Sequence, residues 1–402
     1  MERSFAAGFQ DDEAQAVLAA IDAEETIAFL RDLVRVPTVN PPGDIAAAVA
    51  LCEPPLRDAG FAVRTLAHAP GKPNLVAEWG NPDGPTLAFN AHLDVVPVGD
   101  ERAWTYPPFA AEVVNGRVYG RGAEDDKASV TAQVMAAIAL ARSGVPLRGR
   151  LAVTEVADEE TSGDGARHVI AASGLNPFGV IVGEPTLTRV AIGEKGHAGV
   201  NLTSTGRTAH GALPWEGANA IEGMARVIVA LSDTLQPRLG ERTHPQFMPS
   251  SASVNMIEGG VKANVVPDRC TIFVDRRLVP GEVPDESTAE IRAIAAEAVA
   301  GMAGIAVQVE PNPQMLAATM SDPDGDLAQA MLAANRYLGL SSELTGFSMA
   351  TDGRHFAMAG YPTIIYGPGD PRLAHVPDEW IGIDEVLEAT RAYALAALAL
   401  LR

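Results

Sequence analysis

The chain of 402 residues contains only two cysteines, Cys52 and Cys270, and they do not form a CxxC motif. So little cysteine excludes a disulfide framework and is typical of a reducing compartment. The longest apolar run falls well short of the ~20 residues of a membrane span, and the N-terminal sequence lacks the apolar segment of a signal peptide. These absences predict a cytoplasmic protein with no membrane partner.

Basic residues are scarce as well, with 30 lysines and arginines against 51 acidic residues and a formal net charge of −21. Nucleic acids are bound through a basic face, so this charge balance argues against a nucleic-acid partner. It also poses a problem for an anionic substrate, since local positive charge would have to overcome the repulsive field of the whole protein.

The chain also lacks several motifs of nucleotide-binding and hydrolytic enzymes. It has no G-x-G-x-x-G fingerprint, no phosphate-binding P-loop, no H-E-x-x-H zinc motif and no G-x-S-x-G nucleophile elbow. The candidate functional residues must therefore come from separate segments that the fold brings together.

The order of strand-like and helical segments divides the chain into three parts. Apolar strand-like runs alternate with helical segments over residues 1–195 and again over 311–402, which indicates a layered α/β domain with a mainly parallel sheet. The intervening residues, 196–310, contain two strand–helix–strand units typical of a compact α+β sandwich. We therefore predict one α/β domain that is interrupted by an inserted domain, in agreement with a length suited to two or three domains.

Residues with metal-binding side chains follow three of the strand-like runs. They are His92 and Asp94 after residues 86–90, Glu159 and Glu160 after 151–155, and Glu184 after 180–182. Sites in open α/β sheets form beyond the carboxyl ends of the strands, so we expect these side chains to gather. Asp125, before a strong helix at 128–141, and His375, after Gly367-Pro368-Gly369, complete the set. Each residue alone is explained as well by a solvated loop charge or a helix cap.

The residue types in this set indicate the metal. Two imidazoles and several carboxylates without a thiolate suit zinc or a similar divalent ion. Five candidate ligands exceed the three protein ligands of a typical one-metal site, and they fit two ions that share a bridging carboxylate. We therefore predict two divalent ions, zinc in the first place, with cobalt or manganese as substitutes.

These motifs resemble the di-zinc hydrolase family that contains acetylornithine deacetylase, succinyl-diaminopimelate desuccinylase, aminoacylase and the glutamate carboxypeptidases. The resemblance covers nearly the whole chain and implies a zinc-peptidase-like catalytic domain with an inserted lid or dimerisation domain. It implies that His92 and Glu184 bind one metal, that Glu160 and His375 bind the other, and that Asp125 bridges the two. Ala91 and Ala128 stand where the family usually has glycine, but every ligand is intact.

The resemblance also implies two roles beside the metals. Asp94 matches the acid that orients His92, and a carboxylate in that place fixes the tautomer of the ligand. Glu159 matches the general base, which would take a proton from the water between the metals and pass it to the leaving amine.

Residues of the inserted domain, and one residue after it, match substrate-binding positions of the family. His210, in Thr208-Ala209-His210-Gly211, resembles the lid histidine that stabilises the oxyanion, commonly in the site of the partner subunit. This match predicts a homodimer. Asn264, Arg277 and Arg354 resemble residues that bind the substrate carboxylate. A structural histidine and ordinary surface ion pairs are the alternatives here.

Together these features predict a metal-dependent amidohydrolase that removes an acyl group from a small N-acylated amino acid or related amide. Glu184, where some peptidase relatives carry aspartate, favours this deacylase function. A metallo-carboxypeptidase or dipeptidase is the first alternative. A catalytically inactive metal-binding relative is the second, and it is disfavoured because Glu159 and Asp94 are not needed merely to hold metal.

Overall fold

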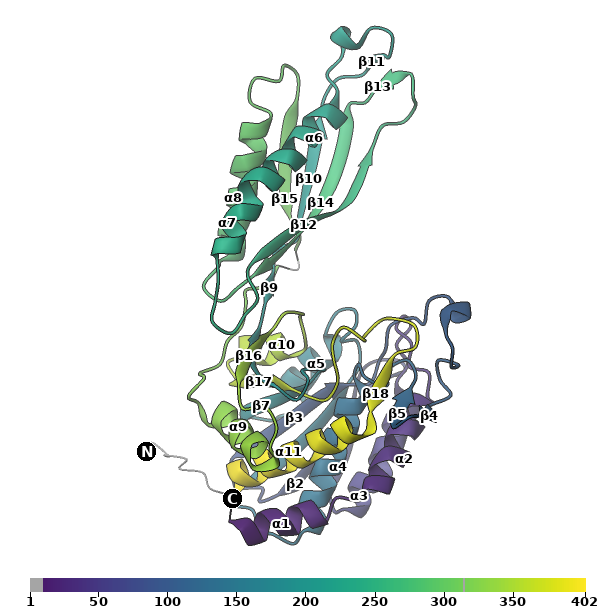
Figure 1. Cartoon of the computed structure of the whole chain (residues 1–402), viewed down its shortest axis with the longest axis vertical. Helices are drawn as coiled ribbons and strands as arrows, with labels where there is room; N and C mark the ends of the chain where they lie inside the picture. Colours follow the sequence, from purple (N-terminus) through teal and green to yellow (C-terminus); the bar gives the residue numbers. More distant parts are fainter. Residues whose placement is uncertain (1–9, 314) are drawn as a thin grey trace. The chain divides into compact units, whose positions relative to one another are not determined.

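The computed structural model describes residues 10–313 and 315–402, which fold into two compact units (Figure 1). The first nine residues, on which part of the signal-peptide prediction depends, lie outside this description. The larger unit holds the chain up to Gly193 together with Met320–Phe347 and Thr351–Arg402. The inserted unit holds Glu194–Thr319 and Ser348–Ala350.

The second boundary therefore lies at residue 319, some way past the boundary expected at 310. The reason is backbone pairing at the base of the inserted unit. Leu316 exchanges two backbone hydrogen bonds with His197 (2.8 and 2.9 Å), and Thr319 exchanges two with Glu194 (3.1 and 3.2 Å).

The larger unit is built around an eight-stranded sheet with the strand order β1-β2-β6-β3-β7-β17-β8-β16. In chain order its strands are β1 (Ala62–Ala69), β2 (Lys72–Gly80), β3 (Thr86–His92), β6 (Arg150–Val156), β7 (Pro177–Gly183), β8 (Val190–Glu194), β16 (Leu344–Phe347) and β17 (Thr363–Tyr366). The four central strands, β6, β3, β7 and β17, run parallel to one another. The predicted α/β class with a mainly parallel sheet is thus confirmed.

Helices cover both faces of this sheet. They are α1 (Asp11–Ala19), α2 (Ala23–Val34), α3 (Ala46–Asp58), α4 (Lys127–Arg142), α5 (Asp164–Ala172), α9 (Asp326–Leu338), α10 (Gly353–Met358) and α11 (Ile383–Leu401). Leu87 and Phe89 of β3 pack in one core cluster with α4, α9 and α11, whereas Ala88 packs in another with α5 and α10. This alternation buries the central strands on both sides, as a parallel sheet requires. A small antiparallel sheet, β4 (Glu112–Val114), β5 (Arg117–Tyr119) and β18 (Trp380–Gly382), completes the unit.

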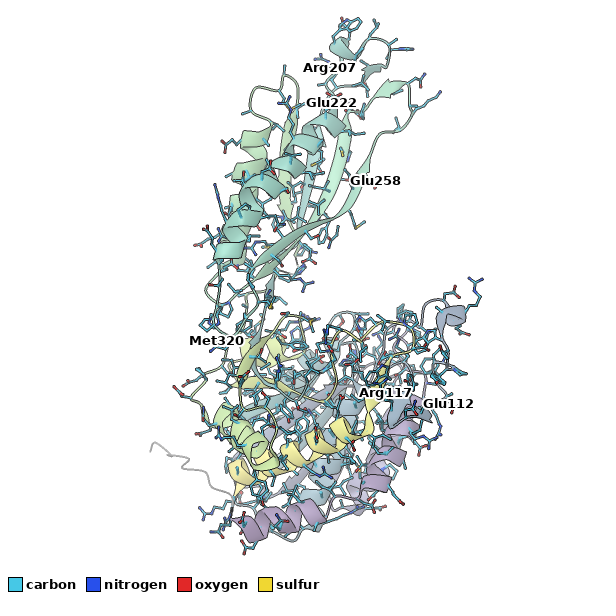
Figure 2. The ribbon with its side chains drawn as sticks, viewed as in Figure 1. Glu112, Arg117, Arg207, Glu222, Glu258 and Met320 are labelled. Atoms are coloured by element: carbon cyan, nitrogen blue, oxygen red, sulfur yellow. The ribbon has the colours of Figure 1, made fainter. Side chains whose placement is uncertain are left out.

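The inserted unit is an α+β sandwich with one helical layer. Its antiparallel strands are β9 (Gly196–His197), β10 (Val200–Thr205), β12 (Ser251–Gly259), β14 (Arg269–Leu278) and β15 (Ala306–Pro311), and its helices are α6 (Ala220–Ala230), α7 (Gln236–Glu241) and α8 (Pro284–Ala298). Alternate residues of β14, Cys270, Ile272 and Val274, pack against α6 and α8. The edge strand β12 carries the exposed Glu258 and lies beside α6, which carries the exposed Glu222 (Figure 2). A separate two-stranded ribbon pairs β11 (Ala209–His210) with β13 (Val265–Val266).

Among the helices of residues 10–313 and 315–402, none combines the length and the apolar character that crossing a bilayer requires.

Candidate metal centre

The candidate ligands lie at the carboxyl edge of the central parallel strands. His92 is the last residue of β3, Glu159 and Glu160 follow β6, and Glu184 follows β7 directly. His375 lies in the loop after β17, and Asp125 precedes α4. Because β6, β3, β7 and β17 are parallel neighbours, these segments leave the sheet at one edge.

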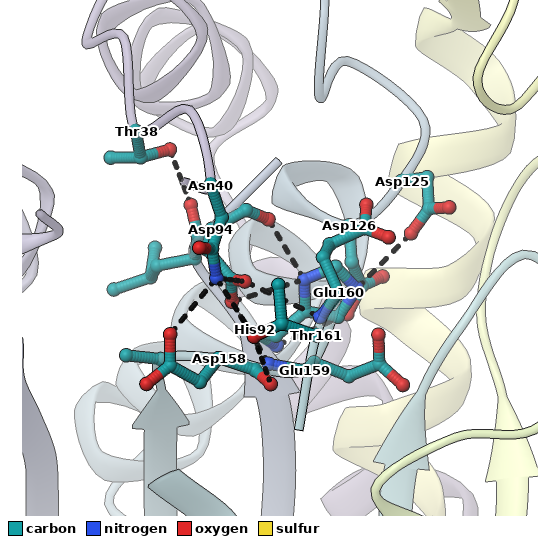
Figure 3. A network of polar contacts seen from close by, with 12 residues as sticks. Thr38, Asn40, His92, Asp94, Asp125, Asp126, Asp158, Glu159, Glu160 and Thr161 are labelled. Carbon is teal, nitrogen blue, oxygen red and sulfur yellow. Dashed lines mark hydrogen bonds and ion pairs between the residues drawn. The ribbon is translucent and has the colours of Figure 1, made fainter. Parts of the chain in front are cut away.

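Two groups of ligand atoms form at this edge, and the residues of the first are labelled in Figure 3. The ligand atoms of His92, Asp125 and Glu160 all lie within 4.8 Å of one another. Those of His92, Glu159 and Glu184 also lie within 4.8 Å of one another, so that His92 belongs to both groups. The structure therefore brings together residues that are separated by up to 92 positions in the chain.

Asp125 faces the two imidazoles with different oxygens. Its Oδ1 lies 3.1 Å from Nε2 of His92, and its Oδ2 lies 3.2 Å from Nε2 of His375. Glu160 approaches the same nitrogen of His375 at 3.2 Å through Oε1. A carboxylate that presents one oxygen on each side has the geometry needed to bridge two cations.

The tautomer of His92 is set by a main-chain carbonyl. Its Nδ1 lies 2.9 Å from the carbonyl oxygen of Asp94, which can only accept, so a neutral His92 carries its proton on Nδ1, and Nε2, which faces Asp125, is the nitrogen that would bind a metal. The carboxylate of Asp94 lies farther from Nδ1, at 3.8 Å. Asp94 thus approaches Nδ1 of His92 with its carbonyl oxygen and, at ion-pair distance, with its carboxylate, and its orienting role stays a prediction.

The carboxylate of Asp94 instead holds the turn after β6. Its Oδ1 accepts a hydrogen bond from the backbone N–H of Glu159 (3.2 Å), and its Oδ2 accepts from that of Glu160 (3.3 Å) and from Nδ2 of Asn40 (2.8 Å). These donors compete with His92 for the carboxylate, which explains the longer distance to the imidazole. Sequence reasoning missed Asn40, whose only signal is its place in the loop Asn40-Pro41-Pro42-Gly43.

A second buried carboxylate, that of Glu379, holds the segment with Asp125. One oxygen accepts hydrogen bonds from the backbone N–H groups of Glu124 (3.0 Å) and Asp125 (3.2 Å), and the other forms a buried ion pair with Arg121. Arg121 and Glu379 lie four residues from the predicted ligands Asp125 and His375, but nothing in their spacing shows that they meet. The peptide bond between Asp125 and Asp126 is cis.

Burial dominates the electrostatics of the carboxylates. It raises the pKa of Glu159 and of Glu184 well above the usual range, and it raises the pKa of Glu160 against the opposing effect of a hydrogen bond to His375. At Asp125 burial acts in the same direction, but the contacts with His375 and His92 outweigh it and lower the pKa.

The acidic neighbours also change the pKa of an imidazole at the site. Contacts with Asp125 and Glu160 raise the pKa of His375 to about 10. So many buried acidic groups are held ionised at little cost only if cations lie between them. The donor set of imidazole nitrogen and carboxylate oxygen fits divalent ions of the zinc type.

Arg354 is the second residue of α10, in the larger unit. Its charge lowers the pKa of Glu159 against the larger effect of burial. The adjacent Asp352 is fully buried, and neither of its carboxyl oxygens has a hydrogen-bond partner among the described residues. Burial raises the pKa of Asp352 to about 7.

The other predicted residues lie in the inserted unit. His210 on β11 pairs with Val265 on β13, and Gly211 donates its N–H to the carbonyl of Asn264 (2.8 Å), so His210 and Asn264 are neighbours. Arg277 is the second-last residue of β14, near the other end of the unit's sheet, and its Nε binds Oδ1 of Asp275 at 2.8 Å.

The chain is similar in sequence to known hydrolases. The sequence model of peptidase family M20/M25/M40 matches residues 88–399. A protein of Rhodospirillum centenum named succinyl-diaminopimelate desuccinylase is 31% identical over 397 residues, which cover 92% of this chain and 96% of that protein. An acetylornithine deacetylase of Vibrio atlanticus is 31% identical over 332 residues, 82% of this chain and 84% of the relative.

A solved structure shares the fold. A dinuclear metal-binding peptidase of Bacillus subtilis superposes with a TM-score of 0.70 at 18% identity, over 94% of this chain and 98% of that one. At this level of identity the likeness concerns the fold alone.

Proposed function

The chain belongs to peptidase family M20/M25/M40 and is a hydrolase, and on that premise we propose that it removes an acyl group from an N-acylated amino acid or a related small amide with the help of two divalent metal ions. Relatives named as a desuccinylase and a deacetylase match most of its length. The observation that carries the proposal is the placing of Asp125, whose two oxygens face the imidazoles of His92 and His375.

We propose the division of ligands between the two ions that the family resemblance implies. His92 and Glu184 would hold one ion, Glu160 and His375 the other, and Asp125 both. In the tautomer with its proton on Nδ1, His92 turns an unprotonated Nε2 toward Asp125, which supports its part as a ligand because neutral imidazole nitrogen is what a metal binds. We propose zinc as the ion, with cobalt or manganese able to replace it. When bound, such a pair polarises the scissile carbonyl and lowers the pKa of water at the site.

Glu159 is the proposed general base. Its carboxylate lies within 4.8 Å of the ligand atoms of His92 and Glu184, and its backbone is held by Asp94. In this role Glu159 accepts a proton from the attacking water as the C–O bond forms. It then gives that proton to the amine nitrogen as the C–N bond breaks, so the products are a carboxylate and an amine.

His210 is the proposed donor to the carbonyl oxygen of the substrate. The backbone N–H of Ala212 donates to Nδ1 of His210 at 3.0 Å, so a neutral His210 carries its proton on Nε2. An Nε2–H group is the donor that a developing oxyanion requires. The short ribbon of β11 and β13 holds the imidazole at an exposed position in the inserted unit.

Three further residues are proposed to recognise the carboxylate of the substrate. Arg354 offers a planar guanidinium whose charge acts on Glu159, and the inserted unit offers Arg277 and Asn264. Together with the metal ions they would supply the local positive charge that an anionic substrate needs inside a chain with a net charge of −21.

We further propose that the protein is a cytoplasmic homodimer that binds neither membrane nor nucleic acid. The edge strand β12 exposes Met256 and Ile257 to 69% and 61%, and Gly259 of the same strand adjoins the exposed Ile221 on α6. An exposed apolar edge strand invites pairing with another strand, and a second copy of this chain would cover it.

The substrate class is tested by assaying the zinc- or cobalt-loaded enzyme on N-acetyl and N-succinyl amino acids beside a panel of dipeptides. We expect hydrolysis of at least one N-acyl amino acid at a kcat/KM well above that for every dipeptide. Release from dipeptides alone would contradict the deacylase proposal and support a peptidase. No hydrolysis by a protein that binds two metals would support an inactive metal-binding relative.

A further inference from the structure

Asp158 lies between the end of β6 and the proposed base Glu159, and both its burial and its backbone conformation are uncommon in proteins. Its side chain is almost fully buried, with 4% exposure, and its backbone adopts a left-handed conformation with a φ of 68°. Aspartate is one of the few residues besides glycine that adopt this conformation, usually as a single residue in a turn. The contacts of Asp158 therefore bear on how the chain turns directly before Glu159 and Glu160.

Three side chains from distant segments converge on the carboxylate of Asp158. Nε2 of His68 lies 2.8 Å from Oδ2, Nδ2 of Asn40 lies 2.9 Å from Oδ1, and Nζ of Lys72 forms an ion pair with Oδ1. Because its oxygens are occupied in this way, Asp158 does not compete with Glu159 and Glu160 as a ligand.

The hairpin of β1 and β2 is shaped to present two of these side chains. The register of the hairpin shifts between Ala67 and Ala69, so His68 lies in a bulge, a feature that redirects a side chain. Asn74 of β2 then connects the hairpin to the turn in two ways. Its Nδ2 lies 3.1 Å from Nδ1 of His68, which leaves the proton of a neutral imidazole on Nε2, facing Asp158. Its Oδ1 accepts the backbone N–H of Ala157 at 3.0 Å.

Asn40 joins this cluster to Asp94. Its Nδ2 lies between Oδ1 of Asp158 (2.9 Å) and Oδ2 of Asp94 (2.8 Å), as Figure 3 shows. Since Asp94 accepts the N–H groups of Glu159 and Glu160, every residue from 157 to 160 has one group held by this network. The contacts fix two consecutive glutamates whose carboxylates belong to different groups of ligand atoms.

We infer that Asp158 is a positioning residue, which uses Lys72, His68 and Asn40 to hold Glu159 and Glu160 in the orientation that the reaction requires. The inference rests on the proposed function, because it concerns how the proposed base and metal ligand are placed. Asp158 itself touches neither substrate nor metal in this account.

The test compares Asp158→Asn and His68→Gln with a matched control. Glu78→Gln is that control. Glu78 lies on β2, as Lys72 does, and it also binds two cations, Arg64 and Arg150. It pairs with β6 near the first residue of that strand, away from the ligands. For the two test variants we expect kcat to fall by about 10- to 100-fold with KM within about threefold, and zinc affinity measured by calorimetry to fall by a factor in the same range. Lys72→Arg, which keeps the cation, should retain most of the activity, and the control should retain kcat and zinc affinity.

A second readout does not depend on the reaction. Hydrogen–deuterium exchange of the amides of residues 157–163 in the metal-free protein should be slow in the wild type and in Glu78→Gln, and faster in Asp158→Asn and His68→Gln. Faster exchange supports the inference even if the wild type hydrolyses no substrate in the panel, an outcome that would count against the proposed function alone. Unchanged exchange, or unchanged kcat and zinc affinity in both test variants, would overturn it.

Discussion

The two units of this protein bury their sheets in different ways. In the larger unit the central strands β3 and β17 are buried along their whole length, with helices on both faces. In the inserted unit the strands alternate between buried and open positions, and the edge strand β12 is mostly exposed. The difference follows from strand direction, because parallel strands joined by helices are covered twice whereas an antiparallel sheet needs only one cover.

The units also treat buried charge differently. Glu124, Glu155 and Asp352 of the larger unit are buried, and no carboxyl oxygen of these three has a hydrogen-bond partner within the described part of the chain. In the inserted unit the buried Arg276 is paired with Glu282, which also binds Arg242. The larger unit therefore buries carboxyl groups without partners, whereas the inserted unit pairs its buried guanidinium, of which only Nε lacks a partner among the described residues.

The largest expected effect is on kcat, and it concerns the sheet edge that carries the candidate ligands. Glu159→Ala should lower kcat by about 10²- to 10⁴-fold, because the proposed base is gone. It should leave two metal ions bound, which metal analysis of the dialysed protein would show. A fully active variant would reject Glu159 as the base, and the loss of a metal ion would make it a ligand instead.

The next effect concerns the contribution of the inserted unit to catalysis. His210→Ala should lower kcat by about 10²- to 10³-fold, with a smaller change in KM, because a donor to the oxyanion is lost. If His210 acts in the site of a partner subunit, mixing this variant with Glu159→Ala should restore part of the activity, since the mixed dimer has one complete site. An unchanged kcat would make His210 a structural residue, and no recovery on mixing would place it in its own subunit's site.

A third substitution sharpens the contrast in buried charge. Glu282→Gln should lower the free energy of unfolding by about 3 kcal/mol, because it leaves the buried guanidinium of Arg276 without its ionic partner. Metal binding in the larger unit should be unchanged. Urea unfolding followed by circular dichroism measures the first quantity and calorimetric titration with zinc the second. A stable variant with weaker zinc binding would contradict the division of roles between the units.

The smallest effect is a pH dependence in the larger unit. Burial lowers the pKa of His355 to about 4, assisted by the charges of Arg354 and Arg167. Between pH 6.5 and 4 the unfolded chain therefore binds a proton that the folded chain does not, so stability falls as the pH falls through this range. In the metal-free protein, His355→Gln should reduce the loss of stability between pH 7.5 and 5 by about 1 kcal/mol, a figure that allows for partial exposure. An equal loss of stability in the wild type and in His355→Gln would contradict the lowered pKa of His355.

The positions of the candidate ligands could be predicted from the sequence, because parallel strands end at one edge and His92, Glu160 and Glu184 follow such strands closely. The contacts that hold these residues in place could not be predicted from the sequence. Asn40 reaches Asp94 across 54 residues, and Glu379 reaches the N–H of Glu124 across 255. Such hydrogen bonds depend on the conformation of loops, for which the sequence has no periodicity. The same holds for the pairing of Leu316 with His197, which extends the inserted unit past residue 310.

The central claim is that the larger unit holds two metal ions bridged by Asp125. Anomalous diffraction at the zinc absorption edge, on crystals of the zinc-loaded protein, tests it most directly. We predict two peaks, one bound by His92 and Glu184 and one by Glu160 and His375, with an oxygen of Asp125 on each. A single peak, or two peaks of which only one touches Asp125, would contradict the account.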